Sequence, residues 1–559
     1  MKSIAYLILF ILLIPSFWWL LGSGYFNMHD DLQVMRFFQM NKCFLDGQIP
    51  CRWSPDMVWG YGQAMFNFYS AFPYYLGTLL HMVFPLTYLS TVKIVFLISF
   101  IIAGFGMYKL AKEFWGKLGG LLSAVLYTYA PYHALDIYVR GAMSESYALS
   151  LLPWMWYFTY RLIKKYSLTD LVGTSVSIAL ILMTHNISTM LYAPITLIWC
   201  VYWIVLTKDL KSTYRLIFAG SLGVGLASFF IIPAVFEQNI IQTKLLTLEY
   251  YDFKGHFVSL RQLFFDRSWG DGPSIYGDFD DISFQVGWPH WWLGILAFFN
   301  LIYLKLKRKA ENGLLFLISA LAVLTALTSF LTHSRSLYIW ELIPQMNFVQ
   351  FPWRILGLVM FFLSFLAGSI GYKKGFVIKS FIVFTILLTI VLNFNYFIPV
   401  QYSRLVTEES KLSGLAFELQ QKAATLDYLP KTARTAPVSK AFEKPKVLEG
   451  DASVSILSVR SDSFSFDADV YNSSFIEIPV MYFPGWKVFV DDKETEINIH
   501  GDYGLIAISL EDGRHSVYGK FTNTPIRSVS NAVSLFSIGI IIVVLRFGGK
   551  YEEKDKRPL

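Results

Sequence analysis

The chain has 559 residues, of which 55% are hydrophobic, 18% aromatic and only 16% charged. Soluble domains carry roughly 25% charged residues, so this composition excludes a soluble globular fold. The net charge of +7 could indicate a nucleic-acid partner, but the basic residues lie in short clusters between apolar segments, as membrane topology signals do, and no nucleic-acid partner is expected.

Apolar segments long enough to cross a bilayer as helices recur from the first residues to about position 395, and once more near the end. The first segment, from Ile4 to Leu21, could be a signal peptide, but it lacks a small-x-small cleavage site, which favours a retained anchor. We predict about twelve transmembrane helices, at residues 4–21, 89–108, 118–133, 146–163, 169–184, 187–206, 213–236, 289–304, 312–331, 353–371, 376–395 and 527–545.

Basic clusters occur at alternate connections between these helices, as the positive-inside rule requires. They are Lys109, Lys112 and Lys117; Arg161, Lys164 and Lys165; Lys208, Lys211 and Arg215; Lys305, Lys307, Arg308 and Lys309; Lys373 and Lys374; and the tail from Lys550 to Arg557. The pattern predicts a multi-pass protein of the plasma membrane with both termini cytoplasmic. Residues 73–87 are interpreted as a short interfacial or re-entrant helix, because a thirteenth span there would invert every later connection.

Three long segments then lie outside the membrane, at residues 23–88, 237–288 and 396–526. This divides the chain into a transmembrane domain (1–395), an extracytoplasmic helix plus β domain (396–526), and a final transmembrane helix with a short cytoplasmic tail (527–559). The predicted fold class is therefore an all-α polytopic membrane protein with a small extracytoplasmic β domain before the last helix.

Residues 402–425 are predicted to be helical, and from Ser453 onward apolar and polar residues alternate as in strands, for example at 475–480 and 487–490. Turn signals at Asp491-Asp492 and at 511–513 predict hairpins, and Pro484-Gly485 ends a strand. The aromatic side chains of this domain could bind glycan or pack a β core; they are Tyr482, Trp486 and Tyr503.

Two of the three cysteines, Cys43 and Cys51, fall in the first external segment. They could form a disulfide in an oxidising compartment or remain free thiols. Neither interpretation supports a metal site.

Ionisable residues near membrane segments are costly and are therefore functional candidates. On the predicted topology they gather at the outer ends of the helices, at His29, Asp30, Asp31, Arg140, Glu145, His185, His290, His333, Arg335 and Arg354. Ordinary interfacial capping could explain any one of them, but it explains the joint pattern less well.

The pair Asp30-Asp31 follows the first span directly. A carboxylate there could be a general base toward an acceptor hydroxyl, or could bind a divalent cation together with its neighbour. Alternatively, Asp30 caps a helix predicted from Leu32 to Leu45. Arg140 and Arg354 would suit a phosphate, since guanidinium groups bind phosphate oxygens in pairs. The predicted substrate- and phosphate-binding set also contains His29, Glu145, His185 and His333.

Several short motifs occur in a fairly specific order along nearly the whole chain. They are His29-Asp30-Asp31; Gly47-Gln48-Ile49-Pro50 leading to Trp53-Ser54-Pro55 and Gly60-Tyr61-Gly62; Arg140-Gly141-Ala142 with Glu145; Thr184-His185-Asn186; Gln350-Phe351-Pro352-Trp353-Arg354; and Tyr482-Phe483-Pro484-Gly485-Trp486. With them the chain resembles the GT-C superfamily of membrane glycosyltransferases, closest to the YfhO-type proteins and the 6-pyruvoyl-tetrahydropterin synthase-related membrane proteins.

The resemblance implies transfer of a sugar from a polyprenyl-phosphate donor to a cell-envelope glycan, lipid or protein acceptor at the outer membrane face, with inversion. It carries the role of catalytic base to Asp30, with Asp31 as partner or alternative base, and places the lipid phosphate near Arg140 or Arg354. Membrane lipid is the other expected partner.

No cofactor is assigned, although a divalent cation is possible. Many GT-C enzymes have a metal-binding motif in a second external loop. Here that loop offers carboxylates in no matching pattern, at Asp266, Asp271, Asp278, Asp280 and Asp281. No His-rich zinc arrangement of the kind used in zinc sites is present in the sequence.

Two other functions remain open from the sequence. A transporter or flippase of lipid-linked saccharides would be expected to have paired halves and polar sites near the bilayer midplane, and neither is evident. A non-catalytic envelope scaffold that displays the β domain is the second alternative.

Overall fold

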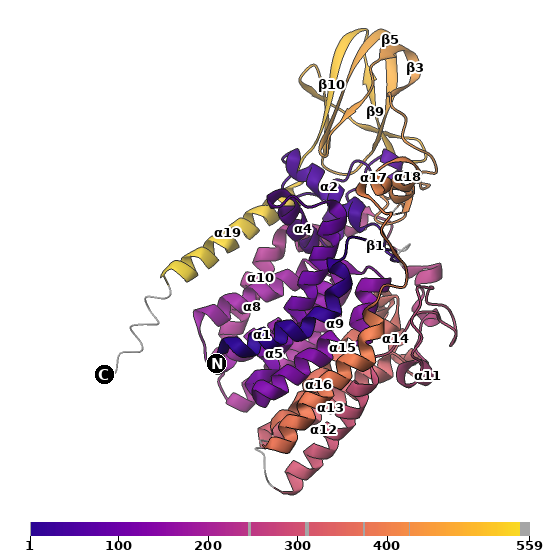
Figure 1. Ribbon diagram of the computed structural model, residues 1–559. Coiled ribbons are helices and arrows are strands. Elements are labelled where there is room, and N and C mark those ends of the chain that lie inside the picture. The colour runs from indigo at the N-terminus through magenta and orange to yellow at the C-terminus, as the bar shows by residue number, and fades with distance from the viewer. Residues whose placement is uncertain (1, 244–246, 308–311, 373–374, 424, 548–559) are drawn as a thin grey trace.

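The computed structural model describes residues 2–243, 247–307, 312–372, 375–423 and 425–547. A bundle of long helices carries a β domain at one end (Figure 1). The bundle helices are α1 (Lys2–Leu13, continued as a 3-10 helix to Leu21), α5 (Tyr88–Thr128), α7 (Met143–Lys164), α8 (Leu168–Leu182), α9 (Asn186–Thr207), α10 (Lys211–Phe236), α12 (Trp288–Leu306), α13 (Asn312–Leu331), α15 (Leu356–Ala367), α16 (Phe376–Asn393) and α19 (Pro525–Phe547).

Short helices and strands fill the connections. The short helices are α2 (Gln33–Leu45), α3 (Met65–Phe68), α4 (Phe72–Val83), α6 (Pro131–Ala134), α11 (Leu260–Phe264), α14 (Leu337–Leu342), α17 (Glu408–Leu412) and α18 (Gly414–Ala423). The strands are β1 (Tyr25–Phe26), β2 (Tyr402–Ser403), β3 (Lys446–Val454), β4 (Ser458–Val459), β5 (Ser463–Met481), β6 (Trp486–Val490), β7 (Lys493–Thr495), β8 (Asn498–His500), β9 (Leu505–Leu510) and β10 (Gly513–Phe521).

Helices form at all twelve predicted membrane spans. Within the described residues, eight helical segments are long and apolar enough to cross a membrane, from Ile4–Leu21 to Pro525–Arg546. Part of the difference from twelve is that α5 contains two predicted spans, 89–108 and 118–133. In addition, α7, α8 and α12 form where predicted but do not reach the same combination of length and hydropathy. The prediction of a polytopic helical membrane protein is confirmed.

The break within α5 lies at Gly116, whose φ of 73° and ψ of −175° are outside the helical region. Glycine adopts positive φ at no steric cost, which permits this turn. The two halves of α5 then approach each other closely, because a Cβ on Gly120 would lie 3.1 Å from the side chains of Tyr108 and Lys112. The two predicted spans therefore form a hairpin.

The helix α15 is the centre of the bundle. Every side chain from Leu356 to Ala367 is buried. A helix that is apolar all round is stable only where other helices surround it. Here it packs against α5, α12 and α13.

The last helix, α19, packs on α10 through small residues. A Cβ on Gly225 of α10 would lie 2.2 Å from the Ser537 hydroxyl, and Ser534 Oγ donates to the Gly225 carbonyl at 3.1 Å. Small residues let two membrane helices approach closely and exchange hydrogen bonds. This contact fixes the β domain, which precedes α19, to the bundle.

The segment predicted as a short interfacial or re-entrant helix, 73–87, overlaps α4, which begins one residue earlier at Phe72 and ends at Val83. Its 12 residues span about 18 Å, which is too short to cross a bilayer. The short strands β1 and β2 pair antiparallel, with Tyr25 opposite Ser403 and Phe26 opposite Tyr402. This pairing brings the first external segment beside the segment that precedes the β domain.

An antiparallel sheet forms the β domain, in the strand order β7-β6-β10-β5-β9-β8, and β3 and β4 also pair with β5. The sheet begins with β3 at Lys446, seven residues before the predicted start at Ser453. The helices α17 and α18 occupy residues 408–423, so the predicted helical segment 402–425 is confirmed except at its ends, where β2 takes residues 402 and 403.

One predicted hairpin turn is confirmed and the other is wrong. Asp491 and Asp492 both have positive φ, 50° and 66°, and join the paired strands β6 and β7. In contrast, β9 and β10 do not pair with each other. Both pair antiparallel with the 19-residue strand β5, Leu510 opposite Ser474 and Gly513 opposite Val470. They therefore run end to end along one strand, and residues 511–512 interrupt this line instead of reversing it.

Strand β5 ends before Pro484-Gly485, as predicted, and Gly485 has a φ of 115°. Trp486 is buried and packs against Trp53 (5.4 Å between ring centroids), Phe464 (5.3 Å) and Phe521 (5.4 Å). Its ring is a core element that attaches the sheet to the first external segment. The interpretation of Trp486 as a glycan-binding aromatic is therefore wrong.

Cys43 and Cys51 form a disulfide, which is one of the two predicted alternatives. Cross-linking over a short loop stabilises a fold by about 2–3 kcal/mol. We expect the double variant Cys43→Ala/Cys51→Ala to have a free energy of unfolding that is lower by this amount, and therefore to unfold at a lower temperature. Alkylation of the denatured wild type should modify one cysteine without reductant and three with it. Three modified cysteines without reductant would contradict the pairing.

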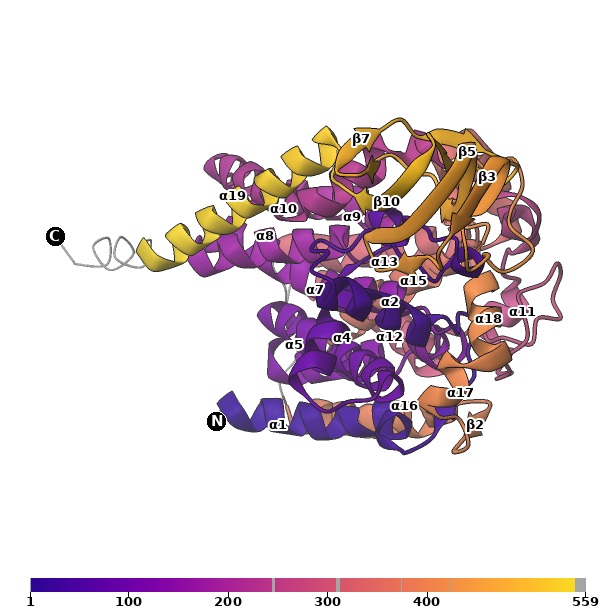
Figure 2. The same cartoon turned by 90° about the horizontal axis from the view of Figure 1, so that it is seen from above.

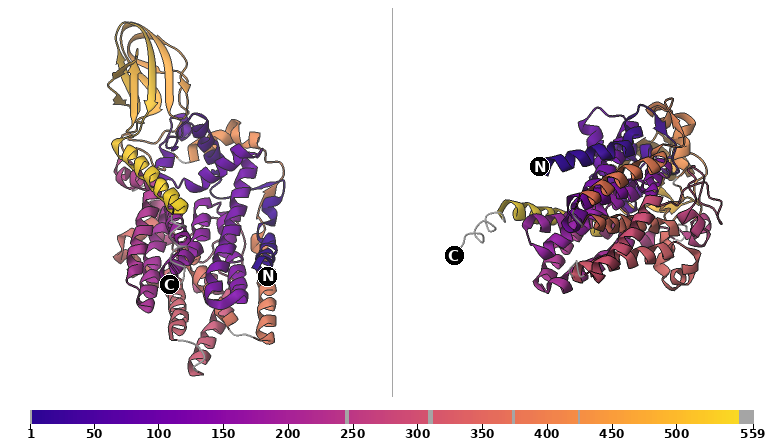
Figure 3. Two further views of the ribbon diagram at one scale, coloured as in Figure 1. Left: turned by 90° about the vertical axis from the view of Figure 1, so that its left-hand side faces the viewer. Right: turned by 60° about the horizontal axis from the view of Figure 1, so that its bottom comes forward.

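The two ends of the bundle differ. The β domain, α17 and α18 lie at one end, and α19 runs from there toward the other end (Figure 3). Seen from above, the β domain lies over one side of the bundle and leaves α1 uncovered (Figure 2). The short helices α2, α17 and α18 lie between the β domain and the bundle (Figure 1).

Candidate functional site

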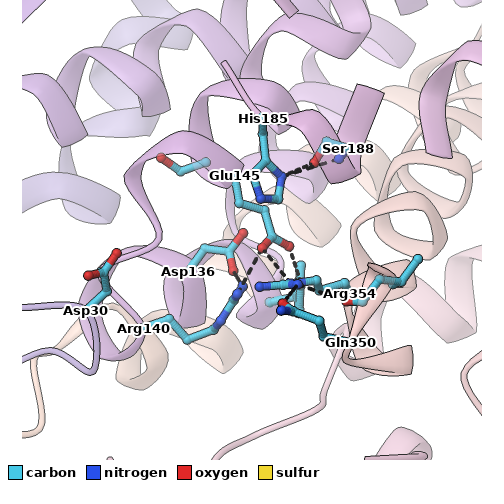
Figure 4. Close-up of polar contacts among 12 residues, drawn as sticks. Asp30, Asp136, Arg140, Glu145, His185, Ser188, Gln350 and Arg354 are labelled. Carbon is cyan, nitrogen blue, oxygen red and sulfur yellow. Dashed lines mark hydrogen bonds and ion pairs between the residues drawn. The ribbon is translucent and has the colours of Figure 1, made fainter. Parts of the chain in front are cut away.

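A cavity of about 1180 Å³ opens at the end of the bundle that carries the β domain. Seven of the eight predicted site residues line it: His29, Asp30, Asp31, Arg140, Glu145, His185 and Arg354. Figure 4 shows Asp30, Arg140, Glu145, His185 and Arg354 among them. They come from the stretch before α2, the segment before α7, the starts of α7 and α9, and the 3-10 turn before α15. The structure therefore gathers residues that are up to 325 positions apart in the sequence into one cavity.

Asp30 lies against an arginine of the following helix. Its carboxylate accepts hydrogen bonds from Arg36 Nη1 at 2.6 Å and from Gln33 Nε2 at 3.2 Å, and 33% of the side chain is exposed. Helix α2 has Leu32 at its N-cap, with no side-chain cap. The alternative that Asp30 caps this helix is therefore wrong, and its carboxylate points into the cavity.

The backbone holds Asp30 beside the second charged segment. The His29 N–H donates to the Val139 carbonyl at 2.8 Å, and the Asp30 N–H donates to the Arg140 carbonyl at 3.0 Å. The imidazole Nε2 of His29 lies 2.9 Å from the Asp271 carbonyl. These bonds join three external segments around the cavity mouth.

Asp31 forms an ion pair with Lys411 of α17. Burial raises the pKa of Asp31, and the ammonium of Lys411 opposes that shift. The contact closes part of the cavity, because α17 and α18 contribute Lys411, Ala416, Leu419 and Gln420 to its lining. A carboxylate of the first segment is thus held by a residue 380 positions away.

The opposite wall is a buried charge cluster (Figure 4). Arg140 pairs with Asp136 and lies 2.9 Å from Glu145, while Arg354 Nε lies 3.4 Å from the same Glu145 carboxylate. The Tyr132 hydroxyl donates to Glu145 Oε1 at 2.6 Å. Two carboxylates therefore balance two guanidinium groups in a site where an unpaired charge would be costly.

Aromatic rings and carbonyl groups orient the two arginines. The guanidinium of Arg140 stacks on Trp353 at 4.5 Å from the ring centroid. Arg354 Nη1 donates to the carbonyl of Val349 and to Gln350 Oε1, both at 2.8 Å. These contacts fix the planes of both groups toward Glu145.

Two of the three histidines in the predicted site, His185 and His333, differ in position. His185 caps α9, with Nδ1 2.7 Å from Ser188 Oγ, and its ring lines the cavity. His333 accepts from the Arg335 N–H at 3.1 Å and caps a 3-10 turn outside the cavity. His333 therefore lies apart from the other seven predicted site residues, because the connection after α13 directs it elsewhere, and its role in substrate binding stays a prediction.

The two arginines predicted to bind phosphate are both near carboxylates. Glu145, which was predicted to bind substrate or phosphate, lies between them. A carboxylate repels a phosphate, so the role that this geometry supports for Glu145 is to hold and orient Arg140 and Arg354. An incoming phosphate would have to share these arginines with it.

Four charged residues were missed by sequence reasoning: Asp136, Arg36, Lys411 and Asp427. The signal for Asp136 was available, since it lies four residues before Arg140 in a helical stretch. Arg36 could have been found as the first charged residue after the Asp30-Asp31 pair, five residues after Asp31. Lys411 and Asp427 gave no local signal, because they reach the cavity through tertiary folding of a distant segment.

The second external loop uses several of its carboxylates structurally. Asp280 accepts from Gln262 Nε2 at 2.6 Å and from the Ile275 N–H at 2.7 Å, and Asp266 pairs with Arg261 at 3.2 Å. Within the residues that the structure describes, no group of three or more His, Cys, Asp or Glu side chains is arranged to hold a metal ion. The possibility of a divalent cation stays a prediction.

The chain is similar to several proteins of known sequence or structure. An uncharacterized protein of Lactococcus lactis subsp. cremoris (strain MG1363) is 23% identical over 271 residues, which are 47% of this chain and 44% of that protein. The chain thus spans less than half of that relative's length. A cryo-EM structure of the arabinofuranosyltransferase AftD from mycobacteria is 13% identical with a TM-score of 0.42, covering 72% of this chain and 27% of that one. A mutant of the same enzyme is 14% identical with the same TM-score, covering 72% and 28%.

The family model described as the 6-pyruvoyl-tetrahydropterin synthase related domain, a membrane protein, matches residues 66–397. This match covers more than half of the chain, from α3 to the end of the bundle before β2. It includes Arg140, Glu145, His185 and Arg354, whereas Asp30 and Asp31 lie before it. The chain belongs to the family of 6-pyruvoyl-tetrahydropterin synthase related membrane proteins.

Proposed function

We propose that this protein is a membrane glycosyltransferase that moves a sugar from a polyprenyl-phosphate donor to an envelope acceptor, with inversion at the anomeric carbon. The observation that supports the proposal best is the single cavity that joins the Asp30-Asp31 pair to Arg140 and Arg354. The reaction needs a base for the acceptor hydroxyl and cations for the departing phosphate, and this cavity contains both kinds of group. The sequence resemblance to GT-C enzymes supplies the reaction class.

In this proposal, Asp30 is the base and Asp31 its alternative. The acceptor oxygen bonds to the anomeric carbon while the bond from that carbon to the phosphate oxygen breaks, and the electron pair leaves with the phosphate. The hydroxyl proton goes to the carboxylate. Positive groups preorganised near the phosphate stabilise its growing charge.

The proposed orientation places the cavity and the β domain outside the cell. In a Cys200→Ser background, Glu494→Cys tests the β domain and Lys165→Cys tests the opposite end, since their parent side chains are 53% and 59% exposed. A membrane-impermeant maleimide should label intact cells only at position 494, and position 165 only after permeabilisation. Labelling in the reverse order would contradict this orientation.

The function is tested with the purified full-length protein in lipid vesicles, supplied with radiolabelled polyprenyl-phosphate sugars and envelope acceptors. Transfer of label to an acceptor is the expected result. If no donor is used, the same vesicles measure movement of the labelled lipid across the bilayer. Movement without transfer would replace the proposed function by transport.

A further inference from the structure

Asp427 is a cavity-lining carboxyl without an obvious partner. It follows α18 and lines the same cavity as Asp30. Asp30 and Asp31 each form an ion pair, with Arg36 and Lys411. Among the described residues, no cation lies within ion-pair distance of Asp427. A carboxyl that keeps no cation partner in a substrate cavity is available for protons or for substrate.

The chain holds Asp427 in a strained and well-anchored segment. The next residue, Tyr428, has a φ of 55°, which is rare for a non-glycine residue and clusters at functional sites. Gln63 donates a hydrogen bond to the Asp427 carbonyl, and the Gln242 N–H donates to the Leu429 carbonyl at 2.9 Å. The first and second external loops therefore both fix this position.

The charged and titratable groups around Asp427 come from three elements. Arg36 and Asp30 face it from the first segment, and Tyr251 faces it from the second loop, while Tyr428 is its neighbour. Burial raises the pKa of Asp427 to about 6, with Asp30 adding to the shift and Arg36 opposing it. Its protonation therefore changes near neutral pH, where a proton acceptor is most effective.

Asp30 already has a cation partner, since Arg36 Nη1 lies 2.6 Å from its carboxylate, whereas Asp427 in the same cavity has none among the described residues. We propose that Asp427 is a second acid–base residue of this cavity, which takes over the proton that Asp30 removes from the acceptor hydroxyl. This inference rests on the proposed transferase function. As in the proposed reaction, the acceptor oxygen forms the new glycosidic bond, and the phosphate departs with the electron pair of the broken bond. The proton passes from Asp30 to Asp427 and then to water in the cavity, which returns Asp30 to its ionised form.

The experiment compares the pH dependence of sugar transfer in wild type, Asp427→Asn and Asp427→Glu in lipid vesicles. In wild type, kcat should fall as the pH drops through about 6, since Asp427 must be ionised to accept a proton. Asp427→Asn should lower kcat about 100-fold at pH 7.5, with KM unchanged and this acidic limb lost. Asp427→Glu should restore the limb and much of the rate.

The matched control is Glu418→Gln, which removes a carboxylate paired with Lys440 at 2.6 Å on α18, outside the cavity lining. It should transfer sugar at the wild-type rate. If Asp427→Asn folds and keeps the acidic limb, or changes only KM, Asp427 is not an acid–base residue. The inference then fails, while the proposed transferase function stands. If Asp427→Asn does not fold, loss of the limb must be seen in Asp427→Ser instead. If wild type transfers no sugar, the proposed function fails, and this inference with it.

Discussion

The substitution Asp30→Asn should abolish most of the sugar transfer. It keeps the size of the side chain and an oxygen that can accept from Arg36, but it removes the basic carboxylate. A positioned general base contributes about 10²–10⁴-fold to the rate, so kcat should fall by that factor while KM changes little. The measurement is initial transfer rate in vesicles at saturating donor.

A matched control lies in the same external segment. Asp56 accepts from Gln39 Nε2 at 2.7 Å and from Lys42 at 2.6 Å, outside the cavity lining, so Asp56→Asn should transfer sugar normally. Asp31→Asn separates the two candidates for the base. If Asp30→Asn retains the wild-type rate and Asp31→Asn loses it, the base is Asp31, and the ion pair with Lys411 must open during catalysis.

The helical bundle could be predicted from the sequence, because the length of an apolar segment indicates whether it can cross a bilayer as a helix. Every predicted span is helical, and the alternation after Ser453 correctly indicated strands. The error at residues 511–513 has a physical cause. Local turn chemistry indicates an interruption there, but whether the chain reverses depends on β5, which is long enough to pair with β9 and β10 in succession.

The candidate site was partly predictable for a similar reason. The ends of packed helices at one membrane face lie near one another. Polar residues at those ends were therefore expected to come together, as Asp30, Glu145 and Arg354 do. His333 lies at such an end, but the connection after α13 leads it away from the cavity. Lys411 and Asp427 could not be predicted, since nothing near them in the sequence indicates that their segment folds back onto the first loop.

The second large effect is expected at Glu145, which contacts both buried arginines. Only 5% of its side chain is exposed, and Glu145→Gln removes the charge that faces Arg140 and Arg354. Breaking a buried ion pair from one side costs about 3–5 kcal/mol, because the remaining charge stays buried. The melting temperature in detergent should therefore fall clearly. Glu494→Gln, which removes an exposed partner of Lys487, should cost less than about 1 kcal/mol.

The double variant Glu145→Gln/Arg354→Gln distinguishes a charge effect from a packing effect. If the lost balance is the cause, removal of both charges should destabilise the protein less than the sum of the single variants. Additive losses would contradict a direct Glu145–Arg354 interaction at 3.4 Å.

The single variant Glu145→Gln also tests where the donor phosphate binds. In wild type, Glu145 competes with any phosphate for Arg140 and Arg354. Without that carboxylate the arginines can accept a phosphate more readily, so polyprenyl phosphate should raise the melting temperature of Glu145→Gln more than that of wild type. An equal rise in both proteins would place the phosphate away from this cluster, and Arg36 and Lys411 would then be the cavity cations to test next.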